Sequence, residues 1–304
     1  MTCRDNSGPL IASDLPLIKL QASIPVDAPV TKIALSGSLL AVVVSPNILQ
    51  IYERQQDCAP IWTLVRSADL CSHIRSIAWT ADSVLALAAH PGNLWIGDAC
   101  IEDQTWVEHI AGNRSFVVGA GISGLNSNPC IWAWDSYKRV RLWNCSLNLD
   151  NGKPVSCDII PNQDVAVMVL DTGSVFLVRN GTCISDIDFR HPCTGAIFLQ
   201  PSSNAVPGLL VMHHRSQKML LVSLESCSAI ELPFVVLTSA SALGDLLGFS
   251  LTQGSFSIFS LSHMGDGPLL TIPFCGQSTV SISFHPTCKL FAIGLQDRFH
   301  IYGV

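Results

Sequence analysis

A repeat with a period near 40 residues constrains this chain more than any other feature of its sequence. Short apolar runs end on an aromatic residue or a valine seven times, at Tyr52, Trp95, Trp143, Val178, Val222, Phe259 and Tyr302. Successive members of this series lie 35 to 48 residues apart. Repeats of this length are supersecondary units, each of which buries its apolar face only against a neighbouring unit. The period therefore gives almost every residue an architectural role before any motif is considered.

Within each unit, three short apolar segments are separated by turns, which indicates strands rather than helices. The second unit places them at residues 74–79, 84–89 and 94–96, and the third at 121–125, 130–134 and 140–143. A period of about 40–45 residues is typical of four-stranded propeller blades. We therefore predict an all-β fold, a closed β-propeller with seven four-stranded blades, and six blades as the alternative count. Residues 1–304 are expected to form this single domain.

The last unit has only three apolar segments before the chain ends at Val304. Residues 17–24 alternate between apolar and polar side chains and are flanked by Pro16 and Pro25. An uncovered edge strand invites association with other chains, and closed rings avoid such edges. We therefore predict that residues 17–24 complete the last blade by pairing with the strand that ends at Tyr302. On this interpretation the chain is complete.

Composition argues against several functional classes. Hydrophobic residues make up 48% of the chain, charged residues 13%, and the formal net charge is −6. The apolar runs are much shorter than the roughly 20 residues that span a bilayer as a helix, so no membrane insertion is expected. Without a dense basic face, nucleic-acid binding is not expected either. Because residues 1–13 contain no apolar signal core, we expect a cytoplasmic or nuclear protein.

The twelve cysteines do not form a recognisable site. No Cys-x-x-Cys pair occurs, and the spacings match no structural zinc pattern. In a reducing compartment such cysteines act as small buried apolar residues. No Gly-x-Ser-x-Gly elbow occurs, and scattered Ser, His and Asp residues do not define a catalytic site without geometry. We therefore predict no catalytic residue, no metal and no cofactor.

One string suggests a different function. Residues 119–124 read Gly-Ala-Gly-Ile-Ser-Gly after an apolar run, like the fingerprint in which glycines open a helix that holds a pyrophosphate. Pro129 would break such a helix in its second turn, and no acid stands about 20 residues further on. Our favoured interpretation places these glycines in closely packed strands. A flavin- or nucleotide-binding enzyme that uses residues 119–124 is the alternative.

Two segments resemble the first strand of WD-repeat propellers, namely IRSIAW at 74–79 and VSISFHP at 280–286. The resemblance extends over essentially the whole chain, although no Trp-Asp pair closes a strand and no Gly-His pair opens a unit. In that family an acid in the turn after a blade's second strand supports the blade by hydrogen bonds. Asp135, Asp171 and Asp297 match this position, so the resemblance implies that they are structural.

The same resemblance implies a non-catalytic platform for protein–protein interaction, which would serve as a scaffold subunit of a multiprotein complex. Such propellers bind partners on the rim where the turn after each second strand meets the loop into each first strand. Aromatic and arginine side chains are favoured interface anchors. Candidate residues near these turns are His73, Arg75, Tyr137, Arg139, Arg215 and Arg298. The low charge fraction also favours a heteromeric complex, because interface cores are depleted in charge.

Overall fold

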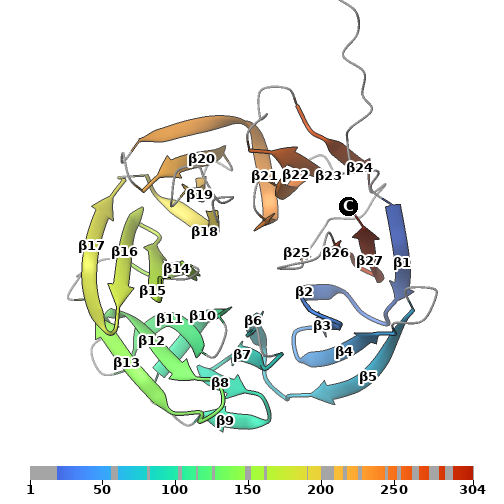
Figure 1. Ribbon diagram of the computed structural model, residues 1–304, viewed down its shortest axis with the longest axis horizontal. Coiled ribbons are helices and arrows are strands. Elements are labelled where there is room, and N and C mark those ends of the chain that lie inside the picture. Colours follow the sequence, from blue (N-terminus) through green and yellow to red (C-terminus); the bar gives the residue numbers. More distant parts are fainter. Residues whose placement is uncertain are drawn as a thin grey trace, which may run out of the picture.

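Strands make up all the regular structure of the described part of the chain. The computed structural model describes residues 19–303, except 56–60, 81–82, 102–104, 114–115, 125–126, 148–151, 161–162, 190, 200–208, 215–217, 225–227, 244–245, 252–254, 262–266, 274–280 and 285–289. The strands are grouped in antiparallel sheets arranged as a ring (Figure 1). The predicted all-β propeller is confirmed, and the ring has seven blades.

Blades 1 to 4 each contain four strands that are consecutive in sequence and are ordered from the centre of the ring outward. Blade 1 comprises β2 (Val30–Ser36), β3 (Leu39–Val44), β4 (Ile48–Arg54) and β5 (Trp62–Asp69). Blade 2 comprises β6 (Ile74–Trp79), β7 (Leu85–Ala89), β8 (Asn93–Ile96) and β9 (Ala99–Ile101). Blade 3 comprises β10 (Thr105–Asn113), β11 (Phe116–Ser123), β12 (Pro129–Asp135) and β13 (Arg141–Ser146). Blade 4 comprises β14 (Pro154–Ile160), β15 (Val165–Leu170), β16 (Ser174–Arg179) and β17 (Thr182–Asp188).

Blades 5 and 6 share one long strand, β21 (Ala229–Leu243). Its first part pairs with β20 and is the outer strand of blade 5, whereas its second part pairs with β22 and is the inner strand of blade 6. The other strands of these blades are β18 (Cys193–Leu199), β19 (Leu209–His214), β20 (Lys218–Ser223), β22 (Leu246–Leu251), β23 (Ser255–Ser260) and β24 (Leu270–Pro273). Together the two blades form one continuous seven-stranded sheet.

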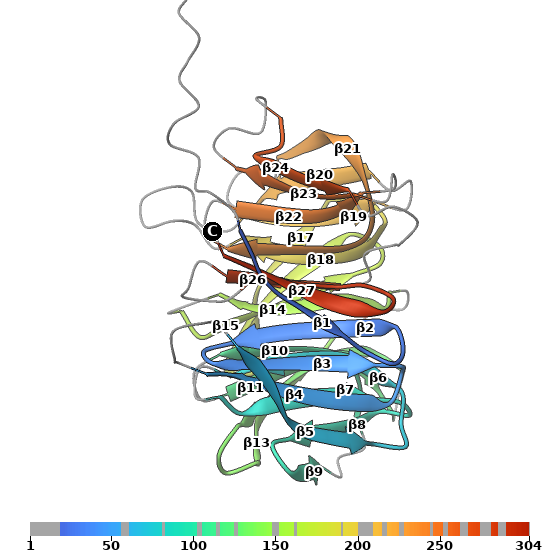
Figure 2. The same ribbon diagram turned by 90° about the vertical axis from the view of Figure 1, so that its right-hand side faces the viewer.

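Blade 7 joins the two ends of the described chain. It comprises β25 (Ser281–Phe284), β26 (Leu290–Gly294), β27 (Arg298–Gly303) and, as its outer strand, β1 (Lys19–Pro25). The antiparallel pairing runs from Lys19 opposite Gly303 to Pro25 opposite Arg298. Figure 2 shows β1 alongside β27. The predicted closure by an N-terminal strand is therefore confirmed for residues 19–24, and it covers the edge that β27 would otherwise expose. Residues 17 and 18 of the predicted segment lie outside the described residues.

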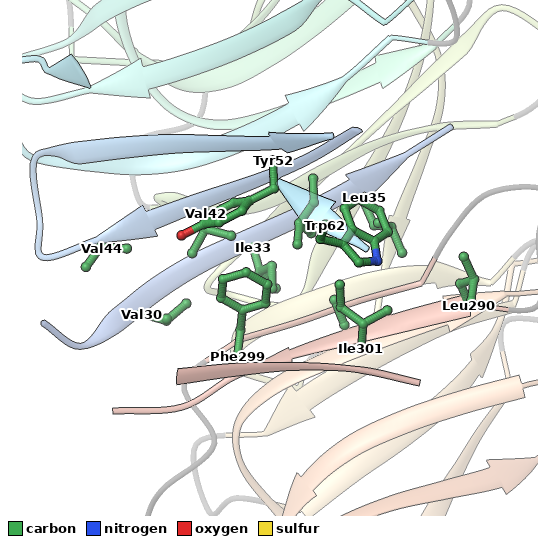
Figure 3. Packing of buried hydrophobic residues seen from close by; sticks show 12 residues of the cluster. Val30, Ile33, Leu35, Val42, Val44, Tyr52, Trp62, Leu290, Phe299 and Ile301 are labelled. Atoms are coloured by element: carbon green, nitrogen blue, oxygen red, sulfur yellow. The ribbon is translucent and has the colours of Figure 1, made fainter. Parts of the chain in front are cut away.

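The apolar core lies between blades rather than in one central mass. At the seam of blades 7 and 1, a cluster from both blades is buried, and Figure 3 shows its side chains filling the space between the two sheets. The rings of Tyr52 and Phe299 meet edge to face, with centroids 4.9 Å apart. Because β3 and β7 are covered on both faces, they are continuous apolar runs without a polar residue.

Side-chain oxygens on inner strands bridge neighbouring blades. Ser281 and Ser283 of blade 7 accept hydrogen bonds from backbone N–H groups of β2, each at 3.1 Å. Ser76 of β6 accepts one from the N–H of Ile110 in β10 at 3.2 Å. The hydroxyl of Ser156 in β14 donates to a carbonyl of β18 at 2.7 Å. These bonds satisfy backbone groups that have no partner within their own sheet, and so they fix the spacing of the blades.

In blade 3 the predicted strand order is wrong by one strand. Residues 130–134 belong to the third strand, β12, rather than the second, and Trp143 lies on the outer strand β13. The register between the second and third strands shows which residue of blade 3 occupies the position that Tyr52 has in blade 1. Tyr52 pairs with Leu40, the second residue of β3, and Trp134 pairs with Val117, the second residue of β11. With Trp134 in the series, the irregular intervals of 48 and 35 residues become 39 and 44.

Candidate functional site

The three acids predicted to be structural occupy two kinds of turn. Asp171 follows β15 and Asp297 follows β26, so both lie after the second strand as predicted, whereas Asp135 ends the third strand, β12. The Asp171 carboxylate accepts a hydrogen bond from the N–H of Lys153 at 3.0 Å, which ties this turn to the start of β14. The Asp135 carboxylate accepts hydrogen bonds from the N–H groups of Tyr137 and Lys138 at 2.9 and 2.7 Å.

Asp297 differs from the other two because its side chain contacts its own neighbour. Its carboxylate oxygens accept bonds from Nε and Nη2 of Arg298 at 3.1 and 2.8 Å, and both side chains are about half exposed. The carbonyl of Asp297 accepts a bond from the N–H of Val26, just after β1. A structural role for all three acids stays a prediction, and the backbone contacts of Asp135 and Asp171 support it.

The residues proposed as a partner-binding rim lie on opposite faces of the ring. Successive strands are antiparallel, so turns after second and fourth strands lie at one end of a blade and turns after first and third strands at the other. The first end, named the entry face here, carries His73, Arg75 and Arg298. Tyr137 and Arg139 follow the third strand β12 and lie on the opposite face. Arg215 lies outside the described residues.

On the entry face, Arg75 bridges blades 2 and 3. Its Nη1 donates to Oε1 of Glu108 on β10, and its Nη2 lies 3.4 Å from Nδ1 of His90 in the turn after β7. The Arg75 and Glu108 side chains are 38% and 29% exposed. An arginine held by contacts within the chain is less available to a partner, so the geometry assigns Arg75 to blade packing. His73 is exposed beside it.

The glycine string at 119–124 does not have the geometry of a nucleotide site. Gly119 and Gly121 lie within β11, which pairs with β10 on one side and β12 on the other. The next strand begins at Pro129, which leaves no length for a helix. A Cβ at Gly121 would lie 1.8 Å from the carbonyl oxygen of Trp106, so glycine is required there for close strand packing. Residues 119–123 of the string therefore belong to a strand packed between two others, as our favoured interpretation predicted.

A pocket of about 380 Å³ opens between blades 1 and 2. Its floor is apolar and comes from the third strand of blade 1 and the second and third strands of blade 2, with Leu49, Ile51, Leu87 and Trp95. Small-molecule and cofactor pockets commonly have volumes of about 300–1,000 Å³, an apolar lining and a few polar groups at fixed positions. This is the site that sequence reasoning missed.

The pocket exists because the outer strand of blade 2 is short. β9 has three residues, whereas β5 has eight and β17 has seven, so β9 covers little of the layer beneath it. The turn that precedes β13 contributes Ser136, Tyr137 and Arg139 from blade 3 to one wall. Residues from three blades therefore line one pocket. The turns after the third strands of blades 2 and 3 border it toward the face opposite the entry face, whereas Leu70, which follows β5, lies at its entry-face end.

Charged side chains stand at the mouth of this pocket. Arg66 on β5 and Asp98 in the turn between β8 and β9 form an ion pair across it at 2.8 Å. The hydrogen bond and the charge of Arg66 hold the pKa of Asp98 below its usual range, and Arg139 acts in the same direction. Gly97, with a φ of 60°, allows the tight turn that presents Asp98. Among the described residues, Arg139 has no ion-pair partner within 4 Å, so the mouth carries one cation in excess.

A histidine and an aspartate on inner strands have shifted pKa values. Burial lowers the pKa of His109 on β10 to about 4, with nearby Glu108 opposing and Lys32 reinforcing the shift. Burial raises the pKa of Asp158 on β14 to about 6, although N–H groups of Ile159 and Phe198 stabilise its charge. Both contact backbone groups of the next blade, at Pro154 and Phe198 respectively. They therefore belong with the serines that bridge the blades.

Comparisons with known proteins identify the fold. The crystal structure of the WD40 beta propeller domain of Doa1 is similar with a TM-score of 0.71, covering 94% of this chain and 97% of that chain. The fold is that of a WD40 β-propeller. The sequences are 11% identical, so the likeness is one of fold. No family model matches this sequence, and no curated protein matches it.

No group of three or more His, Cys, Asp or Glu residues in the described part of the chain could hold a metal ion. No helix in the same part of the chain is long and apolar enough to cross a membrane.

Proposed function

We propose that this protein is a non-catalytic protein–protein interaction platform, a divergent member of the WD-repeat family and a scaffold subunit of a multiprotein complex. WD40 propellers are commonly interaction platforms, and the fold supports that general role. On this proposal the protein works without a cofactor, in the cytoplasm or the nucleus, and binds other proteins through its outer strands and turns.

The observation that carries the proposal is the apolar character of the outer strands. Leu64 and Val65 on β5, Leu142 on β13 and Ile184 on β17 are between 49% and 52% exposed. Single exposed apolar residues are ordinary, but repetition on the outer strands of three blades is what partner-covered surfaces show. Charged residues, at 13% of the chain, are about half as frequent as in average soluble domains. A surface of this kind favours a stable partner because its association removes apolar area from water.

The proposal is tested by the size of the native particle. Protein from its own cells is fractionated by size exclusion at physiological salt, and the fractions are probed for this chain and analysed for co-eluting proteins. A complex well above 32.7 kDa with a constant set of partners supports the proposal. Elution at the monomer position with no co-eluting protein would contradict a constitutive complex.

A further inference from the structure

We propose that the pocket between blades 1 and 2 binds a partner segment that presents a large apolar side chain next to an aspartate or glutamate. This inference rests on the proposed function and identifies where one partner binds and by what chemistry. The partner would contact the protein around Tyr137 and Arg139, toward the face opposite the one that carries His73, Arg75 and Arg298. Strands β4 and β5 of blade 1 and β7 and β8 of blade 2 line the pocket, and Figure 1 shows these two blades next to one another in the ring.

The apolar floor selects an apolar side chain. Leu49, Ile51, Trp79 and Trp95 line the pocket, and the last three are only half-buried although they pack against the core cluster of blades 1 and 2. A partner side chain in this pocket would complete the packing that short β9 leaves open. Burying such a side chain removes apolar surface from water on both molecules, which is the main favourable contribution to association.

The charges at the mouth select an acid beside that side chain. Arg66 is occupied by Asp98, whereas Arg139 lines the same mouth with no ion-pair partner among the described residues. Lys138 and Arg141 lie within two residues of Arg139 and are exposed. The formal charge of the whole chain is −6, so this basic group stands out locally. A guanidinium binds a carboxylate with paired, charge-assisted hydrogen bonds.

The surface beside the pocket favours an extended protein segment over a small molecule. Tyr137 is 59% exposed at the mouth, and Val140 and Leu142, which follow it, are 50% and 52% exposed. A segment anchored in the pocket would continue over these residues on blade 3. Aromatic residues and arginine are enriched in protein–protein interfaces, and both occur at this mouth as Tyr137 and Arg139.

The first experiment measures binding of a defined probe. The probe is the fluorescein-labelled peptide Gly-Ser-Asp-Leu-Phe-Asp-Gly-Ser, and its binding to the full chain is followed by fluorescence anisotropy. Replacing both Asp residues of the peptide by Asn, or Leu-Phe by Ser-Ser, should weaken binding about tenfold or more, because each removes one of the two recognition elements. Equal affinity for the Asp and Asn peptides would overturn the proposed role of Arg139.

Two pairs of variants locate the probe on the protein. Ala68→Trp fills the pocket from β5, where Ala68 pairs with Leu49, and should abolish binding. Its control, Ala229→Trp, places the same ring at an exposed outer-strand position of blade 5 and should bind normally. Arg139→Glu should weaken binding about tenfold or more, whereas Arg179→Glu, the same charge change on β16, should not. Thermal melts of all four variants establish that each one folds.

The outcomes separate this inference from the proposed function. If folded Ala68→Trp binds the probe as the wild type does, the pocket is not the site. If the native complex persists in cells that express Ala68→Trp, its partner binds elsewhere, and the platform proposal stands while this inference fails. If the wild type elutes alone from its own cells, the platform proposal fails regardless of peptide affinity. The inference is supported if Ala68→Trp loses binding of both the probe and the native partner while Ala229→Trp keeps both.

Discussion

Replacing Phe299 by alanine should destabilise the ring at the seam where its last blade meets its first. Phe299 lies on β27, is fully buried, and belongs to a cluster that includes side chains of β2, β3 and β4 as well as β26. Its ring meets that of Tyr52 edge to face at 4.9 Å. The side chain therefore joins blades 7 and 1, and this contact exists only if the ring is closed.

The expected decrease in the free energy of unfolding follows from the volume of the buried side chain. Truncating a fully buried Phe to Ala costs about 3–5 kcal/mol, from lost transfer energy and from the cavity that remains. About 0.5–1.5 kcal/mol of this belongs to the aromatic pair. The double variant Phe299→Ala, Tyr52→Leu should therefore lose less stability than the two single variants added together, by a similar amount. Ile184→Ala, which truncates a half-exposed side chain on β17, should change stability by no more than about 0.5 kcal/mol.

Urea unfolding followed by tryptophan fluorescence measures these differences. A wild-type transition with one midpoint is needed first, because an unfolding intermediate would divide the loss between two steps. A loss for Phe299→Ala below about 1 kcal/mol, equal to that of Ile184→Ala, would refute a packed seam between blades 7 and 1. Additive losses in the double variant would refute direct contact between the two rings.

Three further changes test other parts of the structure. Deleting residues 1–25 removes β1 and exposes the edge of β27, so the melting temperature or the soluble yield should fall; an unchanged melt of a soluble monomer would contradict the closure. Asp171→Ala should cost about 1–3 kcal/mol in urea unfolding, because the N–H of Lys153 loses its acceptor, and Asp171→Asn should restore most of this. Burial raises the pKa of Asp158 to about 6, above the 3.9 typical of unfolded chains. The protonated carboxyl therefore contributes to the free energy of unfolding at low pH, and this contribution is lost as the pH rises through 6. Asp158→Asn should therefore gain stability relative to wild type between pH 4 and pH 8, and a pH-independent difference would contradict the shift.

The repeat could be predicted from sequence, but the order of strands within one blade could not. Trp134 and Trp143 each end an apolar run in blade 3, and the period alone does not say which of them ends the third strand. Choosing Trp143 moved every strand of that blade by one place. Because neighbouring strands run in opposite directions, the error also moved Tyr137 and Arg139 to the wrong face. The more even spacing obtained with Trp134 was the available signal.

The sequence by itself determined the all-β fold, the ring of repeats and the strand that closes it. These follow from alternation and apolar runs, which are local and record whether a strand is covered on one face or both. Only the tertiary structure decided which residues meet at the pocket. Arg66, Asp98 and Arg139 come from three blades, and their proximity depends on the short length of β9 and the packing angle between sheets. Side chains distant in sequence carry no local pattern that marks them as neighbours, so this site appears only when the blades are assembled.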